Sequence, residues 1–413
     1  MRLRHLVSRG ARQVWFRALM FSIAAVLLAL IAGVVGQYLP AGFRVELGQG
    51  SLDSLLKLLA PAMLTVTTFS LTAMVAAYSA AASTGTPRAT QLLLQDHTSQ
   101  NALSTFLGSF VFSIVGIVAL ATGQYDENSR TVLFLGTLAV IGIIVITLLR
   151  WISYLTTMGR MADVIRRVER AATRTMRSFA ESPQMGAAAR VAIPETAEPV
   201  RADKIGYITR VDIAALNSVA EAEDLRIHVV TPPGSFADPG RSMAQVEGEL
   251  DDAVAAVVRR AFTVETNRTY DQDPRLGLIA LSEIASRALS AAVNDPGTAI
   301  QVLGSIERVM ILALTSSVTD EPRYPRVHLW RPGVGDFLED AYRPIARDGA
   351  AVIEVQLRLQ RSLHALEASS ATPLDRQLVR EAAAEASERA LRSLDTEPDR
   401  AALRAVAAHR DAG

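Results

Sequence analysis

The amino-acid sequence contains no cysteine, and neither sign of charge is in excess. Without thiols the chain cannot form disulfides, thiolate zinc sites or cysteine nucleophiles. Its 42 basic residues are balanced by 42 acidic residues, whereas a domain that neutralises nucleic-acid phosphates is net basic. We therefore expect no sulfur chemistry and no nucleic-acid partner.

The sequence also lacks the residue patterns of common active sites. It has no HExxH pair, and no phosphate-binding glycine loop precedes a helix. The histidines are far apart and do not have the spacing of paired metal ligands. They are His5, His97, His228, His328, His364 and His409. We therefore expect a protein that is not an enzyme and has no cofactor or metal site.

Charge is absent from the interiors of four long apolar stretches, at about 16–36, 58–80, 104–122 and 131–149. A helix that crosses about 30 Å of hydrocarbon needs about 20 apolar residues, because only a hydrogen-bonded helix hides its backbone from lipid. The pattern predicts four transmembrane helices within a transmembrane domain of residues 1–157.

The distribution of arginine predicts how these helices are oriented. Arginines cluster before the first stretch and after the fourth, whereas the loops 37–57 and 123–130 carry few basic residues. Such clusters mark the cytoplasmic side. The clustered residues are Arg2, Arg4, Arg9, Arg12, Arg17, Arg150, Arg160, Arg166, Arg167 and Arg170. We expect a multi-pass protein of a bacterial plasma (inner) membrane with both termini in the cytoplasm. Its N-terminal arginines would contact anionic lipid headgroups.

The interiors of the four stretches contain no Asp, Glu, Lys, Arg or His that could relay protons or bind a coupling ion. The second stretch instead carries hydroxyl side chains at helical spacing on one face, which are Thr65, Thr68, Thr72 and Ser79. This stripe could line a wet pathway in a homo-oligomer. Alternatively, the hydroxyls bond to their own backbone or to a neighbouring helix, and we favour this interpretation.

The chain after the fourth stretch divides by composition into four parts. Residues 158–181 predict an arginine-rich amphipathic juxtamembrane helix, and residues 182–201 predict a linker. Residues 202–247 predict a small mixed α/β unit with a hairpin that resembles barrel-sandwich domains. No lysine follows Lys204, so a modified lysine is excluded. Residues 248–413 predict a helical cytoplasmic domain, and the fold class is therefore mainly α.

Two Asp-Pro pairs mark helix starts in the last part, at Asp273-Pro274 and Asp295-Pro296. An aspartate cap followed by proline satisfies the free amides and fixes φ. Charged residues lie between and beside these starts, namely Glu265, Arg268, Asp271, Glu283 and Arg287. They could form a cleft for an anion or a metal, but a network of ion pairs between helices requires fewer assumptions.

The segments "DQDP" at 271–274 and "RALSAAVNDPGTA" at 287–299 resemble the most recognisable block of a bacterial family. That family comprises predicted membrane proteins catalogued as domain of unknown function 2254, and "GYITRVDIAAL" and "PRATQLLLQD" extend the resemblance. The resemblance implies the membrane topology and no particular activity. It singles out Asp273, Pro274, Arg287, Ser290, Asn294, Asp295, Pro296 and Thr298 as motif residues, which we expect to be structural caps and ion pairs.

Two functional hypotheses remain open at this point. The first is an oligomeric channel or passive transport protein with a cytoplasmic regulatory domain, in which the hydroxyl stripe lines the path. The second is a membrane-anchored sensor or scaffold whose cytoplasmic domain binds a protein or a small ligand. The size of the part after the fourth stretch favours the second hypothesis, whereas the hydroxyl stripe favours the first.

Overall fold

The computed structural model describes residues 19–24, 26–27, 31, 50–84, 86–94, 97–122, 127–315 and 321–408. The chain forms two compact units. The first unit comprises Met1–Thr84 and Thr90–Asp163, and the second comprises Gly85–Ala89 and Val164–Gly413. Most of the predicted span at 16–36 and all the N-terminal arginines up to Arg17 lie outside the described residues.

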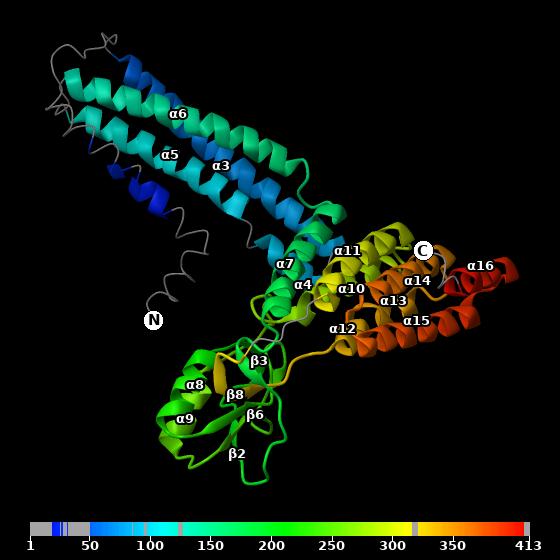
Figure 1. Ribbon diagram of the computed structural model, residues 1–413. Coiled ribbons are helices and arrows are strands. Elements are labelled where there is room, and N and C mark those ends of the chain that lie inside the picture. The colour runs from blue at the N-terminus through cyan, green and yellow to red at the C-terminus, as the bar shows by residue number, and fades with distance from the viewer. Residues whose placement is uncertain are drawn as a thin grey trace. The chain divides into compact units, whose positions relative to one another are not determined.

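Long apolar helices build the first unit and run side by side in Figure 1. These are α3 (Ser51–Thr84), α5 (His97–Ala121) and α6 (Glu127–Leu155). The short α4 (Pro87–Leu94) follows α3 in the chain, and its first residues, 87–89, belong to the second unit. Stretches long and apolar enough to cross a membrane occupy Ser51–Ala80, Thr98–Ala121 and Asn128–Leu155. They overlap the predicted spans at 58–80, 104–122 and 131–149, and each begins earlier than predicted.

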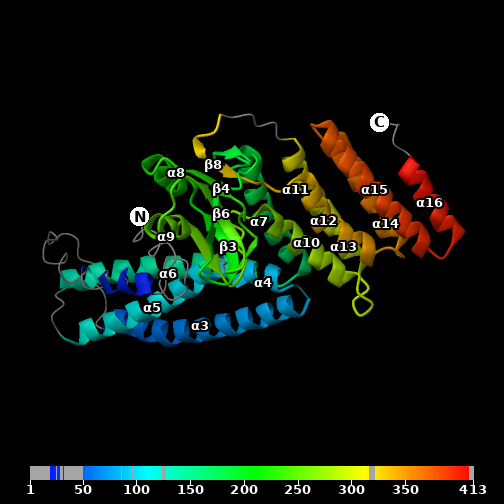
Figure 2. The same cartoon turned by 90° about the horizontal axis from the view of Figure 1, so that it is seen from below.

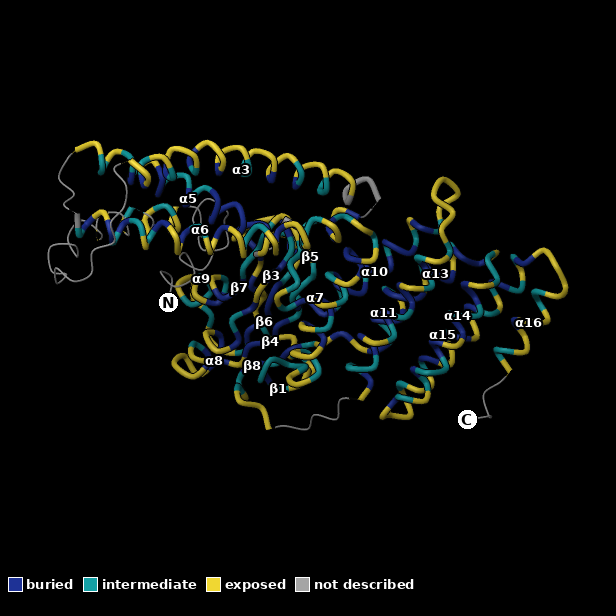
Figure 3. The backbone as a smooth tube through the Cα atoms, turned by 90° about the horizontal axis from the view of Figure 1, so that it is seen from above, coloured by how far each residue is buried: buried dark blue, intermediate teal, exposed yellow. Residues whose placement is uncertain are grey.

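Close packing joins α3 to α5 within the first unit. Ser109 and Ser113 of α5 are buried, and a Cβ at Gly116 would lie only 3.0 Å from a methyl of Leu56 on α3. Small residues let helices approach closely where lipid supplies no hydrophobic driving force. Large apolar side chains such as Phe69, 66% exposed, point away from this contact. Figure 3 shows the exposed positions along α3, as expected for a helix surrounded by lipid.

Helix α7 (Met161–Glu181) leads into the second unit. Its apolar residues, including Val164, Ile165 and Val168, are fully buried, whereas Arg170 and Arg174 are exposed. This division matches an amphipathic helix. The amphipathic helix predicted at 158–181 is thus present as α7, which begins at Met161.

Two small sheets follow α7. The five-stranded sheet has the order β1-β8-β4-β6-β2, in which β8 pairs in parallel with both β1 and β4. The three-stranded sheet is antiparallel, with the order β5-β3-β7. Helices α8 and α9 pack against the sheets (Figure 1). The strands are β1 (Ala187–Ala189), β2 (Glu198–Arg201), β3 (Gly206–Val211), β4 (Arg226–Val229), β5 (Phe236–Ala237), β6 (Ser242–Glu247), β7 (Phe262–Glu265) and β8 (Tyr324–Leu329), and the helices are α8 (Ile213–Ala222) and α9 (Asp252–Arg260).

The predicted boundaries of the mixed unit were wrong on both sides. The supposed linker at 182–201 contains β1 and β2, and the supposedly helical part from residue 248 contributes β7 and β8. Strands of three or four residues show too little alternation to be recognised in a sequence. Their partners are also remote, since β1 pairs with a strand more than 130 residues away. The predicted hairpin corresponds to the antiparallel pair β4–β6.

Helices make up the rest of the second unit, and α14, α15 and α16 lie next to one another (Figure 2). Together with the helices of the first unit, they make the protein mainly α, as predicted. The helices are α10 (Pro274–Ala288), α11 (Pro296–Leu314), α12 (Val334–Ala341), α13 (Arg343–Asp348), α14 (Ile353–Ser369), α15 (Pro373–Ser393) and α16 (Glu397–Ala408).

Helix α11 is also long and apolar enough to cross a membrane. However, it packs between α10 and α14, and Val302, Ile306 and Val309 are fully buried. It carries two adjacent charged residues near its middle, each paired with another helix: Glu307 with Arg358, and Arg308 with Glu169. We therefore interpret α11 as the central core helix of the second unit.

The link between α7 and α11 gives a pH-dependent contribution to stability. Glu169 accepts hydrogen bonds from Arg308 Nε at 2.6 Å and from the Ser305 hydroxyl at 2.7 Å. The Arg308 hydrogen bond is the main reason why the pKa of Glu169 lies below its ordinary value. A carboxylate with a lowered pKa in the folded state stabilises the fold above its unfolded pKa, and this contribution disappears as the pH falls through the folded value.

We expect Glu169→Gln to lower the stability of the second unit at neutral pH by up to about 1 kcal/mol, because Arg308 is largely exposed and water screens the pair. The deficit should vanish in acid, where Glu169 is protonated in both states. Melting temperatures of both proteins across the acidic range would measure this. Glu388→Gln, in an exposed pair with Arg392, is the control. A deficit that is constant with pH would contradict the prediction.

Candidate functional site

The "DQDP" segment lies at the start of α10, where Asp273 is the N-cap and Pro274 is the first helical residue. The Asp273 carboxylate accepts from the backbone amides of Arg275 and Leu276 at 3.1 and 3.2 Å. It also accepts from Arg268 Nε at 2.6 Å. Asp273 is only 1% exposed, so this is a buried cap and a buried ion pair at once.

The same segment joins the sheets to the helices. Gln272 accepts a hydrogen bond from the amide of Val211 at 2.9 Å, and its own amide group faces the Val211 carbonyl oxygen at 3.5 Å. Gln272 thus continues the hydrogen-bonding pattern at the end of β3. Gly234, with φ of +89°, lies so close to Asp273 that a Cβ there would collide with its carboxylate. The backbone conformation and the close approach both require glycine at this position.

Tyr270 connects the segment to α7 and to a stretch of chain between two apolar helices. Its carbonyl oxygen accepts from the hydroxyl of Thr175 on α7. Its phenol donates to the carbonyl oxygen of Arg88 at 3.1 Å. Burial raises the pKa of Tyr270 above its ordinary value, so the phenol keeps the proton that it donates. The guanidinium of Arg88 pairs with Glu283 on α10.

We call this arrangement the motif joint, defined as residues 268–275 with their contacts to Arg88, Thr175, Val211 and Gly234. Arg275 extends it to α12, because its guanidinium binds Asp340 at 2.5 and 3.0 Å. Chain segments that are remote in sequence therefore meet at one short stretch. All of them belong to the second unit.

The second motif segment forms the turn between α10 and α11. The hydroxyl of Ser290 donates to the carbonyl oxygen of Arg287 at 2.7 Å. Asn294 has a φ of +48°, a conformation that asparagine tolerates well. Asp295 caps α11 ahead of Pro296, and Thr298 donates to it from its amide and its hydroxyl at 3.0 and 2.6 Å. Both Asp-Pro pairs therefore act as helix caps.

Two of the charged residues considered for a cleft, Glu283 and Arg268, lie in ion pairs. Glu283 pairs with Arg88, whereas Arg268 pairs with Asp273. In the part of the chain that the structure describes, no three histidine or acidic side chains are placed to hold a metal ion. Ion pairs, the interpretation that required fewer assumptions, therefore account for Glu283 and Arg268.

The hydroxyl stripe lies on the exposed side of α3. Thr65, Thr68, Thr72 and Ser79 are all exposed in the single chain. The hydroxyls of Thr65, Thr68 and Thr72 each donate to the backbone carbonyl four residues earlier, at 2.9 to 3.0 Å. This is the alternative that we favoured from the sequence. The oxygens retain acceptor capacity, so the stripe is a polar surface without free donors at these three positions.

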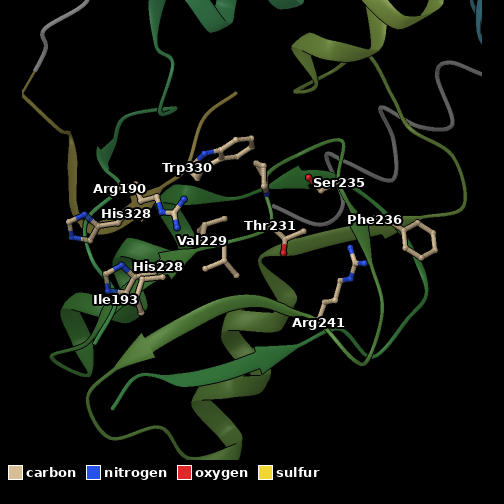
Figure 4. Close-up of a pocket in the computed structure, with 12 residues that line it drawn as sticks. Arg190, Ile193, His228, Val229, Thr231, Ser235, Phe236, Arg241, His328 and Trp330 are labelled. Carbon is tan, nitrogen blue, oxygen red and sulfur yellow. The ribbon is translucent and has the colours of Figure 1, made fainter. Parts of the chain in front are cut away.

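A pocket of about 370 Å³ lies beside β4 and β8 in the second unit (Figure 4). His228 and His328 stack there with ring centroids 5.1 Å apart, because they are direct partners in the parallel β4–β8 pair. Sequence analysis could not reveal this pair, because the two strands lie about 100 residues apart. The pocket is lined by Arg190, Ile193, His228, Val229, Val230, Thr231, Pro232, Ser235, Phe236, Arg241, His328 and Trp330.

A bundle of apolar helices joined to a mixed α/β and helical unit defines an integral membrane protein. The chain belongs to the family described as predicted membrane protein (DUF2254), which it matches over residues 11–365. This confirms the family resemblance inferred from the two motif segments. The family description also supports the interpretation as a membrane protein.

Similar proteins carry no assigned activity in their names. An uncharacterised protein of Mycobacterium bovis is 28% identical over 226 residues, which cover 52% of this chain and 43% of that protein. Uncharacterised proteins from two strains of Mycobacterium tuberculosis match to the same extent. The match thus spans less than half the length of these relatives. No solved structure gives a significant match.

Proposed function

We propose that this protein is a membrane-anchored sensor. Its second unit binds a small ligand in the cytoplasm and transmits the bound state to helices α3 and α5. The observation that carries the proposal is the placement of Gly85–Ala89, the inter-span segment, which follows α3 in the chain but belongs to the second unit. Two contacts hold the segment there: the ion pair of Arg88 with Glu283, and the hydrogen bond from the Tyr270 phenol to the Arg88 carbonyl oxygen. The proposal assigns no catalytic step.

The same observation supports the proposed topology. The inter-span segment follows α3, and the rest of the second unit follows α6. Since both belong to one compact unit, α3 and α6 would end on the same side of the membrane, with α5 and α6 crossing it between them. The arginine clusters favour the cytoplasm for that side. We therefore propose a plasma-membrane protein with cytoplasmic termini.

Transmission through the inter-span segment can be tested by hydrogen exchange on the full chain in lipid nanodiscs. Glu283→Ala changes only α10, but it leaves Arg88 without its ion-pair partner. For a partly exposed pair we expect a loss of about 1 kcal/mol, hence roughly fivefold faster exchange over residues 86–94 and the first turns of α5. The double replacement Arg88→Glu with Glu283→Arg should restore part of the protection.

Arg308→Ala is the matched control, because it breaks an ion pair of the same kind between α7 and α11 without touching the inter-span segment. It should leave exchange over 86–103 unchanged. If Glu283→Ala speeds exchange in α10 alone, the two units are not coupled through Arg88. The sensor proposal then loses the observation that carries it.

A channel remains the second candidate, favoured by the exposed hydroxyl stripe on α3. It requires several copies, since the stripe of one chain faces outward. The hydroxyl donors of Thr65, Thr68 and Thr72 are already engaged by their own backbone, which leaves only acceptors for a passing ion. A current in liposomes that Thr65→Val with Thr72→Val reduces would favour the channel. The sensor proposal expects no current.

A further inference from the structure

We propose that the pocket beside β4 and β8, here called the sheet pocket, binds a small organic anion that carries a planar ring. Arg190 would hold the anionic group and Trp330 would stack against the ring. This inference rests on the proposed sensor function and names the chemical class of its ligand. The cations and the aromatic residues of the pocket support it, and a buried histidine forms one wall.

The charge of the lining is wholly positive. Arg190 and Arg241 contribute guanidinium groups, and none of the twelve lining residues is an aspartate or glutamate. Arg241 meets Asp238 only at 3.5 Å, and its side chain is 73% exposed. Among the described residues, Arg190 forms no ion pair with an acidic side chain. Many other arginines of the second unit lie in ion pairs, such as Arg268, Arg275 and Arg308. A free guanidinium favours a carboxylate or phosphate, which it can bind with two hydrogen bonds.

One wall of the sheet pocket contains a buried histidine with an unused nitrogen. His228 is 2% exposed, and its Nε2 lies 2.5 Å from Glu247. Its Nδ1 has no hydrogen-bond partner in the described part of the chain. Buried polar atoms are nearly always paired. Glu247 and the stacked His328 thus fix the ring of His228 in this wall.

Aromatic surface is available at the same pocket. Trp330 is only partly buried and Phe236 is 42% exposed, although both are large apolar residues. Figure 4 shows Trp330 and Arg190 from neighbouring parts of the lining. An indole stacks on planar rings and tolerates different ring types. The volume of about 370 Å³ lies within the range of small-molecule sites, and a nucleoside monophosphate is a suitable probe.

The test uses the fluorescence of Trp330 in the full chain. The protein has three tryptophans, so Trp15→Phe with Trp151→Phe leaves Trp330 as the only one. Titration with adenosine monophosphate should quench its emission saturably. Adenosine, which lacks the anion, and inorganic phosphate, which lacks the ring, should each bind at least about tenfold more weakly. Nicotinate tests whether a carboxylate can replace the phosphate.

Arg190→Gln should weaken binding of the monophosphate at least about tenfold, because a charged hydrogen bond contributes about 1.5–3 kcal/mol. Arg361→Gln is the control, since Arg361 is an exposed arginine of α14 outside the pocket. Stronger binding of nicotinate that also depends on Arg190 would support the inference with a carboxylate as the anion. Equal binding of adenosine, equal binding of inorganic phosphate, or quenching that ignores Arg190→Gln would overturn it.

The outcome can be separated from that of the sensor proposal. If no probe quenches Trp330 up to millimolar concentration, the proposed ligand site in the sheet pocket is wrong. The hydrogen-exchange experiment would still test coupling through Arg88 independently. Conversely, saturable binding that depends on Arg190 but leaves exchange over residues 86–103 unchanged would keep the pocket. The proposed transmission to the membrane helices would then be wrong.

Discussion

Replacement of Asp273 by alanine is expected to destabilise the second unit by about 3–5 kcal/mol. The carboxylate is 1% exposed and pairs with Arg268, whose side chain is 16% exposed. Removing it leaves the nearly buried guanidinium of Arg268 without a partner. An unpaired buried charge strongly destabilises the folded state. The two backbone amides at the start of α10 also lose their acceptor, which adds the cost of a lost cap.

The melting temperature of the second unit measures this effect, with Trp330 emission as the reporter in the Trp15→Phe, Trp151→Phe background. At about 2–4 °C per kcal/mol for a unit of this size, we expect a fall of roughly 10 °C or more. Asp295→Ala is the matched control, because Asp295 also caps a helix ahead of proline but is exposed. It should cost only about 1 kcal/mol. Equal losses for both variants would show that the Arg268 pair contributes nothing.

The contrast between these two aspartates shows what the sequence could predict. Both caps follow from the local pattern Asp-Pro, because the amides that they satisfy lie two or three residues ahead. The sequence contained no information on their burial. Asp273 is buried because Gly234 and Arg268 pack against it, and Gly234 comes from a turn that lies about 40 residues earlier. The spans at 58–80, 104–122 and 131–149 were predictable for the same local reason, since each is defined by its own composition.

The contacts that suggest a function are all long-range. Arg88 meets Glu283 and Tyr270 across more than 180 residues, and nothing in the sequence around Arg88 marks it as part of the second unit. His228 and His328 meet through the register of two parallel strands. One of these, β8, contains Pro325, Arg326 and His328 and lacks the apolar character of a central strand. The sequence therefore did not reveal that β8 is a strand, that Arg88 belongs to the second unit, or that His228 and His328 form a pair.

Helix packing in the second unit gives the other large expected effect. A Cβ at Gly277 of α10 would lie 2.7 Å from the Cα of Ala172 on α7, and it would also collide with the Ala172 Cβ. These atoms cannot move by a rotamer change, so the two helices must separate. Gly277→Ala gains up to about 1 kcal/mol of helix propensity, but overpacking typically costs about 1–3 kcal/mol. Because backbone atoms are involved, we expect the cost to dominate, with a net loss of about 2 kcal/mol.

Gly304→Ala in α11 separates the gain in helix propensity from the cost of overpacking. A Cβ there would meet only the guanidinium groups of Arg308 and Arg358 at 3.5 Å, which is an ordinary contact. The propensity gain should therefore appear alone, so the melting temperature should rise with Gly304→Ala and fall with Gly277→Ala. Adding Ala172→Gly to Gly277→Ala removes the collision with the Cβ but keeps the one with the Cα, so rescue should be partial. A rise for Gly277→Ala itself would mean that α7 and α10 are not held in contact, and the motif joint would lose its attachment to α7 through Thr175.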